Sequence, residues 1–148
     1  MTAALSVLLV LLGSQISLTL HLASTPTRTS SSNCAFLITN RLVEGGRQTT
    51  CLKSVGGFPS PHAKLKSSGT MVFVLKGGSL HARFSSILAF AGDGVHARQT
   101  VRGSVTGGTG RYRGCRGTVA ATGTVVDRPT ALGPVRATYR LTLARGSC

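Results

Sequence analysis

The segment VRATYRLTL, residues 135–143, alternates apolar and polar side chains along its whole length. Successive side chains of a β-strand point to opposite faces of the sheet, so a period of two indicates a half-buried strand. One face of this segment carries Val135, Ala137, Tyr139, Leu141 and Leu143, and the other carries Arg136, Thr138, Arg140 and Thr142. The pattern predicts a strand whose apolar face lies inward and whose basic residues lie in solvent.

Similar runs, bounded by glycine and proline, predict further strands along the chain. They cover residues 17–23, 34–39 (a buried strand), 47–54, 69–75, 79–84, 95–105 and 117–126. Turns are expected at residues 44–46 and 77–78, and loops at 25–33, 56–68 and 127–134. Residues 85–94 fit either a short strand or one helical turn. No segment predicts a long helix.

About eight short strands with one apolar face each favour an antiparallel sheet that closes on itself. We therefore predict one all-β domain over residues 17–148, an eight-stranded antiparallel up-and-down β-barrel. In such a barrel the first strand pairs with the last, and LTLHL at 18–22 is similar to YRLTL at 139–143. A β-sandwich is the alternative that the sequence leaves open.

The chain is strongly basic. Seventeen Lys and Arg accompany only three acidic residues, Glu44, Asp93 and Asp127, which gives a formal net charge of +14, while 41% of the residues are hydrophobic. That hydrophobic content suffices for a packed core and argues against intrinsic disorder. The three carboxylates are far apart in sequence, which disfavours a hydrolase that uses two of them. The charge favours an anionic partner, although a solvated surface without a partner accounts for it equally well.

The N-terminus predicts export. Residues 5–13, LSVLLVLLG, have the length of the apolar core of a signal peptide and are too short to span a bilayer. The preceding MTAA lacks a basic residue, and no A-x-A cleavage site follows. We assign residues 1–16 to a signal peptide and expect a secreted, extracellular protein.

Four cysteines without a C-x-x-C pair favour two disulfides in an exported chain over a metal site. Three connectivities are available. The sequence-local one joins Cys34 to Cys51 and Cys115 to Cys148, because each pair flanks strands expected to be neighbours. Each closed loop would stabilise the fold by about 3 to 4 kcal/mol on the chain-entropy model. Four reduced, buried thiols are the alternative.

Residues 106–119 read TGGTGRYRGCRGTV. This segment resembles the GGTGxYxGARG motif of the dirigent and allene oxide cyclase barrel superfamily, particularly its small exported bacterial members, and Cys115 stands where the family usually has alanine. The flanking strands follow the family order over most of residues 17–143. The resemblance implies an eight-stranded barrel with an apolar cavity, and it makes an oligomer conceivable.

The glycines of this motif have a structural explanation. We expect Gly107, Gly108, Gly110, Gly114 and Gly117 to allow positive φ and close approach of strands, and Tyr112 to act as a packing anchor. A phosphate-binding loop is disfavoured, since G-x-x-x-x-G-K-[ST] is absent and no helix start follows.

Few polar groups are expected inside the barrel. We predict a pocket lined by Phe73, Tyr139 and Leu141, with Tyr139 and Asp93 as the only polar candidates, each with a structural explanation: a core tyrosine and a turn aspartate. The catalytic residues are unknown. The sequence lacks G-x-S-x-G, H-E-x-x-H and any clustered ligand set, so we expect no metal and no cofactor. The few aromatic residues disfavour specific nucleic-acid binding by stacking.

Two functions follow as expectations. The first is a barrel that binds a small apolar molecule and guides its stereoselective coupling or cyclisation, which as an enzyme would be an isomerase of the cyclase type. The second is a non-catalytic barrel whose basic exterior binds an anionic cell-wall polymer or a membrane surface. A repeated HAR, at residues 81–83 and 96–98, would place each His and Arg together on an outward strand face.

Overall fold

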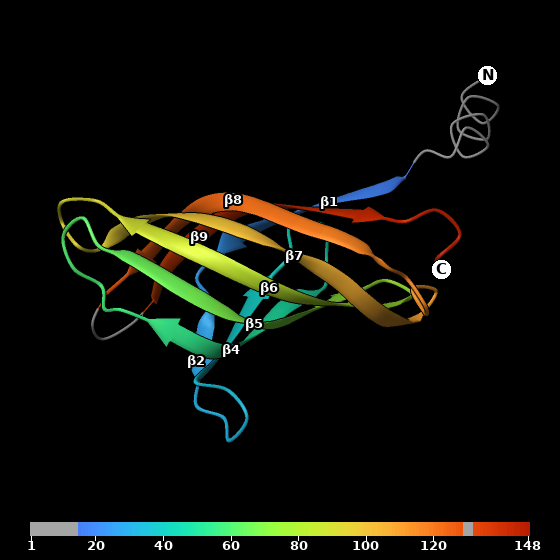
Figure 1. Cartoon of the computed structure of the whole chain (residues 1–148), viewed down its shortest axis with the longest axis horizontal. Coiled ribbons are helices and arrows are strands. Elements are labelled where there is room, and N and C mark those ends of the chain that lie inside the picture. Colours follow the sequence, from blue (N-terminus) through green and yellow to red (C-terminus); the bar gives the residue numbers. More distant parts are fainter. Residues whose placement is uncertain (1–14, 129–131) are drawn as a thin grey trace.

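The computed structural model describes residues 15–128 and 132–148, so most of the predicted signal peptide lies outside the described residues. The described chain forms one antiparallel sheet of nine strands and contains no helix (Figure 1). The strands are β1 (Ile16–Ser24), β2 (Thr27–Thr29), β3 (Phe36–Arg41), β4 (Arg47–Gly56), β5 (Lys64–Leu75), β6 (Gly78–Phe90), β7 (His96–Gly110), β8 (Gly117–Asp127) and β9 (Leu132–Leu143). Within these residues there is no helix long and apolar enough to cross a membrane.

The sheet curls into a half-barrel. Its strand order is β1-β9-β8-β7-β6-β5-β4-β3-β2, so the first strand pairs with the last, as the sequence predicts. The register sets Leu18 opposite Leu141 and Leu20 opposite Tyr139. The two edges of the sheet approach each other where Leu22 forms a single antiparallel bridge with Leu42. The all-β antiparallel prediction is confirmed, and the sheet is broadly barrel-like.

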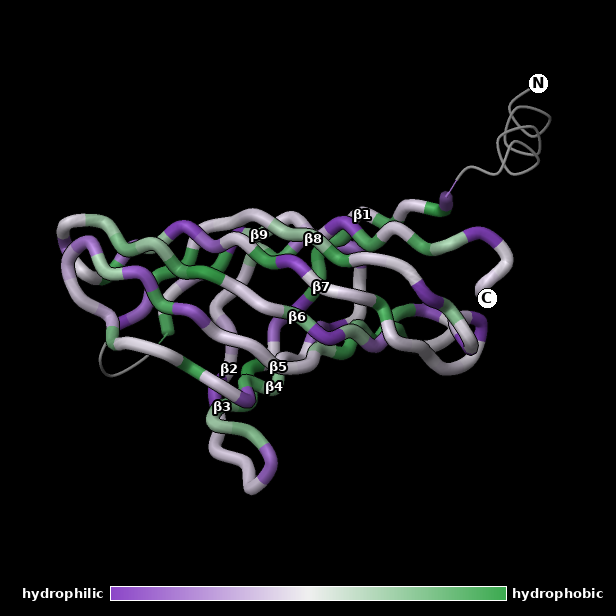
Figure 2. The backbone as a smooth tube through the Cα atoms, in the orientation of Figure 1, coloured by the Kyte–Doolittle hydropathy of each residue, from purple (hydrophilic) through white to green (hydrophobic). Residues whose placement is uncertain are grey.

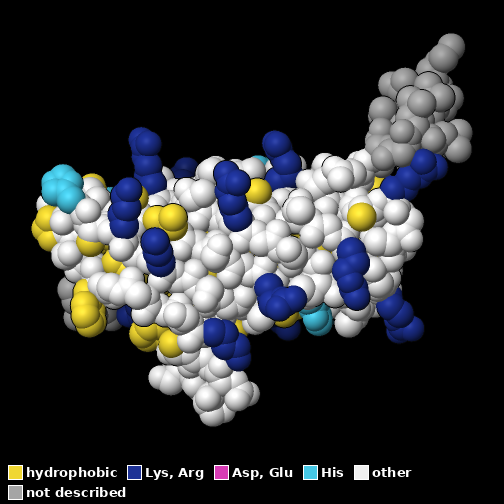
Figure 3. Space-filling view, viewed as in Figure 1, with side chains coloured by type: hydrophobic (Ala, Val, Ile, Leu, Met, Phe, Trp, Pro, Cys, Tyr) yellow, Lys and Arg dark blue, Asp and Glu magenta, His cyan; other side chains and the backbone are white. Residues whose placement is uncertain are grey.

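The core lies on the concave side and follows the predicted alternation. Along β9 every second residue, from Val135 to Leu143, is buried, and Arg136 and Arg140 are exposed. Figure 2 shows the resulting interleaving of hydrophobic and hydrophilic residues along the strands. Lys and Arg side chains project from the outer surface (Figure 3). The period of two therefore gives the orientation of the long strands correctly.

Several strand boundaries differ from the prediction. A short additional strand, β2, forms inside the predicted loop 25–33 and pairs with β3. Strand β5 begins at Lys64 rather than after residue 68, because Pro59 and Pro61 occupy only the turn before it. Strand β9 likewise begins at Leu132, inside the predicted loop 127–134, of which residues 129–131 lie outside the described chain.

Strand β6 extends through Phe90, which resolves the ambiguous segment 85–94 as strand followed by a turn. Strand β7 extends to Gly110 and so includes the first glycines of the Gly-rich segment. The prediction that 34–39 is a buried strand is wrong: β3 begins at Phe36, which is 39% exposed, and only Asn40 is buried within it. Because β3 lies near an edge of the sheet, its apolar side chains are only partly covered.

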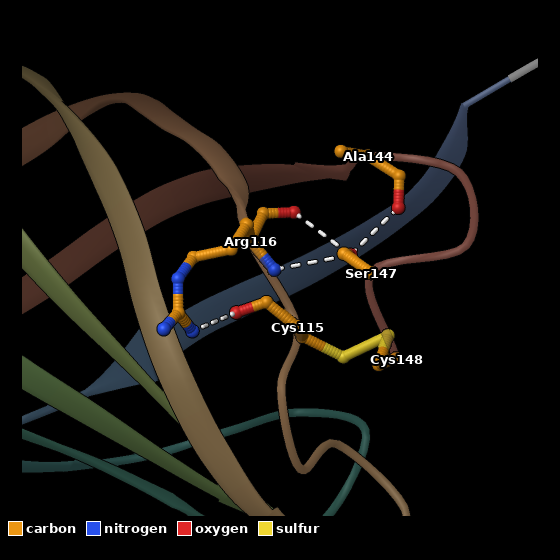
Figure 4. Close-up of a disulfide and its surroundings, with 5 residues drawn as sticks. All are labelled: Cys115, Arg116, Ala144, Ser147 and Cys148. Carbon is orange, nitrogen blue, oxygen red and sulfur yellow. Dashed lines mark hydrogen bonds between the residues drawn. A yellow bond between two sulfur atoms is a disulfide. The ribbon is translucent and has the colours of Figure 1, made fainter.

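Both disulfides join the sequence-local pairs, Cys34 to Cys51 and Cys115 to Cys148. The first ties the start of β3 to β4. The second fixes the C-terminus to the turn between β7 and β8, where the Ser147 hydroxyl donates to the Ala144 carbonyl oxygen at 2.6 Å and accepts from the Arg116 backbone N–H at 3.1 Å (Figure 4). Cys115 is fully buried, so this disulfide closes one end of the core.

The Gly-rich segment forms the turn at that closed end. Gly110 has φ +59°, and a Cβ there would lie 2.2 Å from the Gly77 carbonyl oxygen. A Cβ on Gly117 would lie 1.9 Å from the Thr142 carbonyl oxygen. Tyr112 packs against the core, and the Arg111 guanidinium lies over its ring. The turn is thus built by close backbone approach, and it lies at the end of the sheet opposite the site described next.

Candidate functional site

A cavity of about 850 Å³ lies on the concave side of the sheet. Its mouth is formed by the loop between β4 and β5, the turn between β6 and β7 and the adjoining ends of β8 and β9. In Figure 1 this end is at the left, away from the C-terminus. The volume falls within the range of small-molecule sites in proteins.

The wall of the cavity is mostly apolar. Its buried apolar side chains are Leu22, Leu65, Met71, Phe84, Val125 and Val135. At the mouth, Phe58 is 85% exposed and also lines the cavity. Phe58 therefore adds exposed apolar surface at the opening of the cavity.

Charged groups occur only at the rim among the described lining residues. Arg28 on β2 lies 4.0 Å from the Asp127 carboxylate at the end of β8, and its guanidinium lies over the Phe36 ring. Burial raises the pKa of Asp127, and the positive charge of Arg28 lowers it in part. Strand β2 therefore connects the β3 edge to β8 across the mouth, which gives this unpredicted strand a position beside the site.

Of the three pocket residues that the sequence suggests, Tyr139 lines the cavity. Phe73 and Leu141 are fully buried in the packed part of the core and are not among the lining residues. The Phe73 ring meets the Tyr139 ring edge-on, with centroids 5.5 Å apart. Phe73 thus packs against the Tyr139 ring from within the core.

The Tyr139 hydroxyl is available for hydrogen bonding. Burial raises the pKa of this phenol, so it stays neutral at physiological pH and can both donate and accept. No partner for it is present within residues 15–128 and 132–148. Burial is the only cause of this shift among the described residues, and no described charged group contributes to it, so this tyrosine is suited to bind a polar group rather than to transfer a proton.

A polar cluster on β3 and β4 lines the same cavity and was not predicted. The Asn40 Nδ2 donates to Gln48 Oε1 at 3.3 Å, and the Gln48 Nε2 donates to Thr50 Oγ1 at 2.6 Å. All three side chains are buried, Gln48 completely. The segment RQTTCL at 47–52 has no apolar face in the sequence, and only its burial in the folded sheet shows that Gln48 and Thr50 point inward.

The cluster contains one unsatisfied atom. The Asn40 Oδ1 is buried and has no hydrogen-bond partner. A buried acceptor without a partner costs about 1 to 3 kcal/mol. Ser67 and Ser86, which also line the cavity, bond to each other at 2.6 Å and so satisfy their hydroxyls internally. The free acceptor of Asn40 is therefore a position at which a ligand donor would gain a hydrogen bond.

Asp93 has the structural role that its turn suggests. Its carboxylate accepts hydrogen bonds from the His96 and Val95 backbone N–H groups at 2.9 and 2.8 Å, and it also contacts the His96 ring. These bonds lower its pKa to about 2. Asp93 lines the mouth of the cavity, but its carboxylate is engaged in the turn.

The described residues contain no group of three His, Cys, Asp or Glu side chains that could hold a metal ion. Comparisons of the chain with protein-family models, with curated proteins and with solved structures found no match.

Proposed function

We propose that this protein is an exported binding protein that holds one small, mostly apolar molecule carrying a hydrogen-bond donor. The observation that carries the proposal is the free Asn40 Oδ1 inside an apolar cavity of about 850 Å³. An apolar wall favours an apolar body at about 25 cal/mol per Å² of buried surface, and the buried, unpaired Asn40 acceptor favours a donor on it.

The polar cluster and Tyr139 would fix the orientation of the ligand. A hydroxyl or N–H on the ligand donates to Asn40 Oδ1, while the apolar body lies against Met71, Phe84 and Val135. The Tyr139 hydroxyl, on β9, offers a second polar contact. Two polar contacts on different strands hold an elongated molecule in one direction.

This proposal extends the resemblance of residues 106–119 to the dirigent and allene oxide cyclase superfamily. A molecule held in a single orientation exposes one face to a reaction partner or folds in one way, which is how a barrel without an acid–base pair would guide stereoselective coupling or cyclisation. The two disulfides support an oxidising, extracellular location.

Two matched probes test the binding proposal. 2-Naphthol carries a hydroxyl donor and 2-methylnaphthalene carries none, and the two molecules are otherwise similar in size. We expect 2-naphthol to bind about tenfold more tightly in titration calorimetry, the effect of about one hydrogen bond. Failure of both probes to bind would refute the proposed cavity function.

The variant N40L/Q48M/T50V tests the role of the polar cluster in binding. It removes all three partners together, so no group of the cluster is left unsatisfied, and the fold should be retained. We expect the preference for 2-naphthol to disappear while 2-methylnaphthalene still binds. The control Y139F should reduce the preference less, and an unchanged preference in the triple variant would exclude Asn40 as the acceptor. Native mass spectrometry of protein from its own host would then identify the retained molecule.

A further inference from the structure

The outer face of β7, β8 and β9 carries a regular three-by-three array of exposed side chains, which we call the Arg/Thr grid. Its members are Arg98, Thr100 and Arg102 on β7, Ala120, Thr122 and Thr124 on β8, and Arg136, Thr138 and Arg140 on β9. All nine are exposed. The grid lies on the side of the sheet opposite the cavity.

The strand register orders these residues into rows. Arg98 lies opposite Thr124, which lies opposite Arg136. The next outward row is Thr100, Thr122 and Thr138, and the last is Arg102, Ala120 and Arg140. The four arginines therefore occupy the corners, and the positions between them hold four threonines and Ala120.

The spacing follows from sheet geometry. Neighbouring strands are about 4.8 Å apart, so the arginines on β7 and β9 originate about 10 Å apart. Along each strand the two arginines are separated by four residues, about 14 Å. Between the two pairs, β8 presents only small side chains. The result is a strip of small side chains along β8 with two arginines on each side.

The corner arginines have no competing acid. None of the four forms an ion pair within the described residues, and each described carboxylate is engaged elsewhere: Glu44 with His21, Asp93 with His96 and Asp127 with Arg28. Lys and Arg are spread over the face that Figure 3 shows, and no described acidic side chain is visible on it. The middle row continues on β1 with His21, which lies opposite Thr138, so Glu44, bound to His21, is the described acidic side chain beside the grid.

We propose that the Arg/Thr grid binds an extended anionic polysaccharide that lies along β8. Guanidinium groups bind carboxylates and sulfates through paired hydrogen bonds, and they would do so from both sides of the chain. The threonine hydroxyls, each both a donor and an acceptor, suit the hydroxyls of the sugars.

The composition of the grid favours this partner over two others. It contains no aromatic side chain on which nucleic-acid bases could stack. It also contains no large apolar side chain that could insert into a membrane. This binding surface is independent of the cavity function.

The test compares two variants of equal net charge. The grid variant R98Q/R102Q/R136Q/R140Q removes the corners, and the control R41Q/R47Q/K76Q/R113Q removes four exposed charges outside the grid. Binding of octagalacturonate and of a sulfated octasaccharide is measured by titration calorimetry at several salt concentrations. Circular dichroism verifies that both variants are folded.

We expect the grid variant to lose at least tenfold in affinity and the control less than threefold. The slope of log K against log salt concentration should fall by about 3 in the grid variant, at about 0.7 for each lost charge contact on a single-stranded polyanion. The variant T122V removes the central hydroxyl without changing charge and should weaken binding, whereas T118V, on the same strand outside the grid, should not.

Three outcomes would overturn the proposal. Equal losses in the grid and control variants would show that net charge alone attracts the polymer. Absence of binding of both octasaccharides would exclude this partner. Tighter, grid-dependent binding of a 12-nucleotide single-stranded DNA, or of phosphatidylglycerol vesicles, would assign the grid to a different class of partner.

Discussion

The Nδ1 atom of His21, on β1, lies 2.6 Å from the Oε2 atom of Glu44, which follows β3. The His21 backbone N–H also donates to Glu44 Oε1 at 2.6 Å, and its carbonyl oxygen accepts from the Val43 N–H at 2.8 Å. Together with the bridge between Leu22 and Leu42, these bonds join the two edges of the sheet. Elsewhere neighbouring long strands share continuous ladders, so this seam is where the half-barrel should open first.

Loss of the Glu44 carboxylate should loosen the seam locally. We expect E44A to accelerate amide hydrogen exchange at Val43 while lowering the free energy of unfolding by only about 0.5 to 1 kcal/mol, since the pair is largely exposed and screened by solvent. E44Q keeps one acceptor for the His21 N–H and should show a smaller acceleration. Unchanged exchange at Val43 in E44A would show that the backbone contacts, from Val43 to His21 and between Leu22 and Leu42, hold the seam without the carboxylate.

Asp93 and Asp127 should change the stability of this protein with pH in opposite directions. Hydrogen bonds from the His96 and Val95 backbone lower the folded pKa of Asp93 from 3.8 to about 2, so its stabilising contribution is complete above pH 3.8 and is lost as the pH falls toward 2. Urea unfolding should show wild type and D93N converging over this window.

Asp127 provides a control of opposite sign. Its folded pKa is raised, chiefly by burial, so the folded state binds more protons than the unfolded state and ionisation disfavours folding as the pH rises above 3.8. D127N should therefore become more stable relative to wild type as the pH rises. If D127N and D93N change with pH in the same direction, the environments described for these carboxylates are incorrect.

The two disulfides should contribute unequally to the free energy of unfolding. They close loops with sequence separations of 17 and 33 residues, for which chain entropy gives about 3 and about 4 kcal/mol. Cys115 is also fully buried, so C115A/C148A should lose more stability than C34A/C51A in denaturant unfolding. The opposite order would mean that the attachment of β3, near the edge of the sheet, limits the stability of the fold more than that of the C-terminus does.

The long strands could be predicted because they obey a simple rule. Strands β7, β8 and β9 alternate exposed residues with buried or partly buried ones over most of their length, and the sequence shows this as alternation. The pairing of β1 with β9 followed from the similarity of their two segments. The short strand β2 carries no apolar residue and forms only because β3 offers a pairing edge, so no local pattern could reveal it.

The polar part of the site could not be predicted for a related reason. Gln48 and Thr50 belong to a strand without a hydrophobic face, and their inward direction depends on register with Asn40 and on the curl of the sheet. Phe73 and Leu141 were expected at the pocket because they are large and inward, but that property describes the packed core as well as a cavity wall. Alternation predicts which side of the sheet a side chain lies on, but not whether that position lies in the packed core or beside the cavity.

The Gly-rich turn allows close approach and backbone conformation to be separated. Gly110 and Gly146 both have positive φ, +59° and +70°, which costs an alanine about 1 kcal/mol. A Cβ at Gly110 would also lie 2.2 Å from the Gly77 carbonyl oxygen, whereas Gly146 has no atom within 4 Å of that position. We expect G146A to lose about 1 kcal/mol and G110A about 2 to 3 kcal/mol in urea unfolding. Because both variants carry the same conformational cost, the excess in G110A measures the contact between the β5–β6 and β7–β8 turns. Equal losses would mean that the two turns separate without resistance, and the glycine would then be required for its conformation alone.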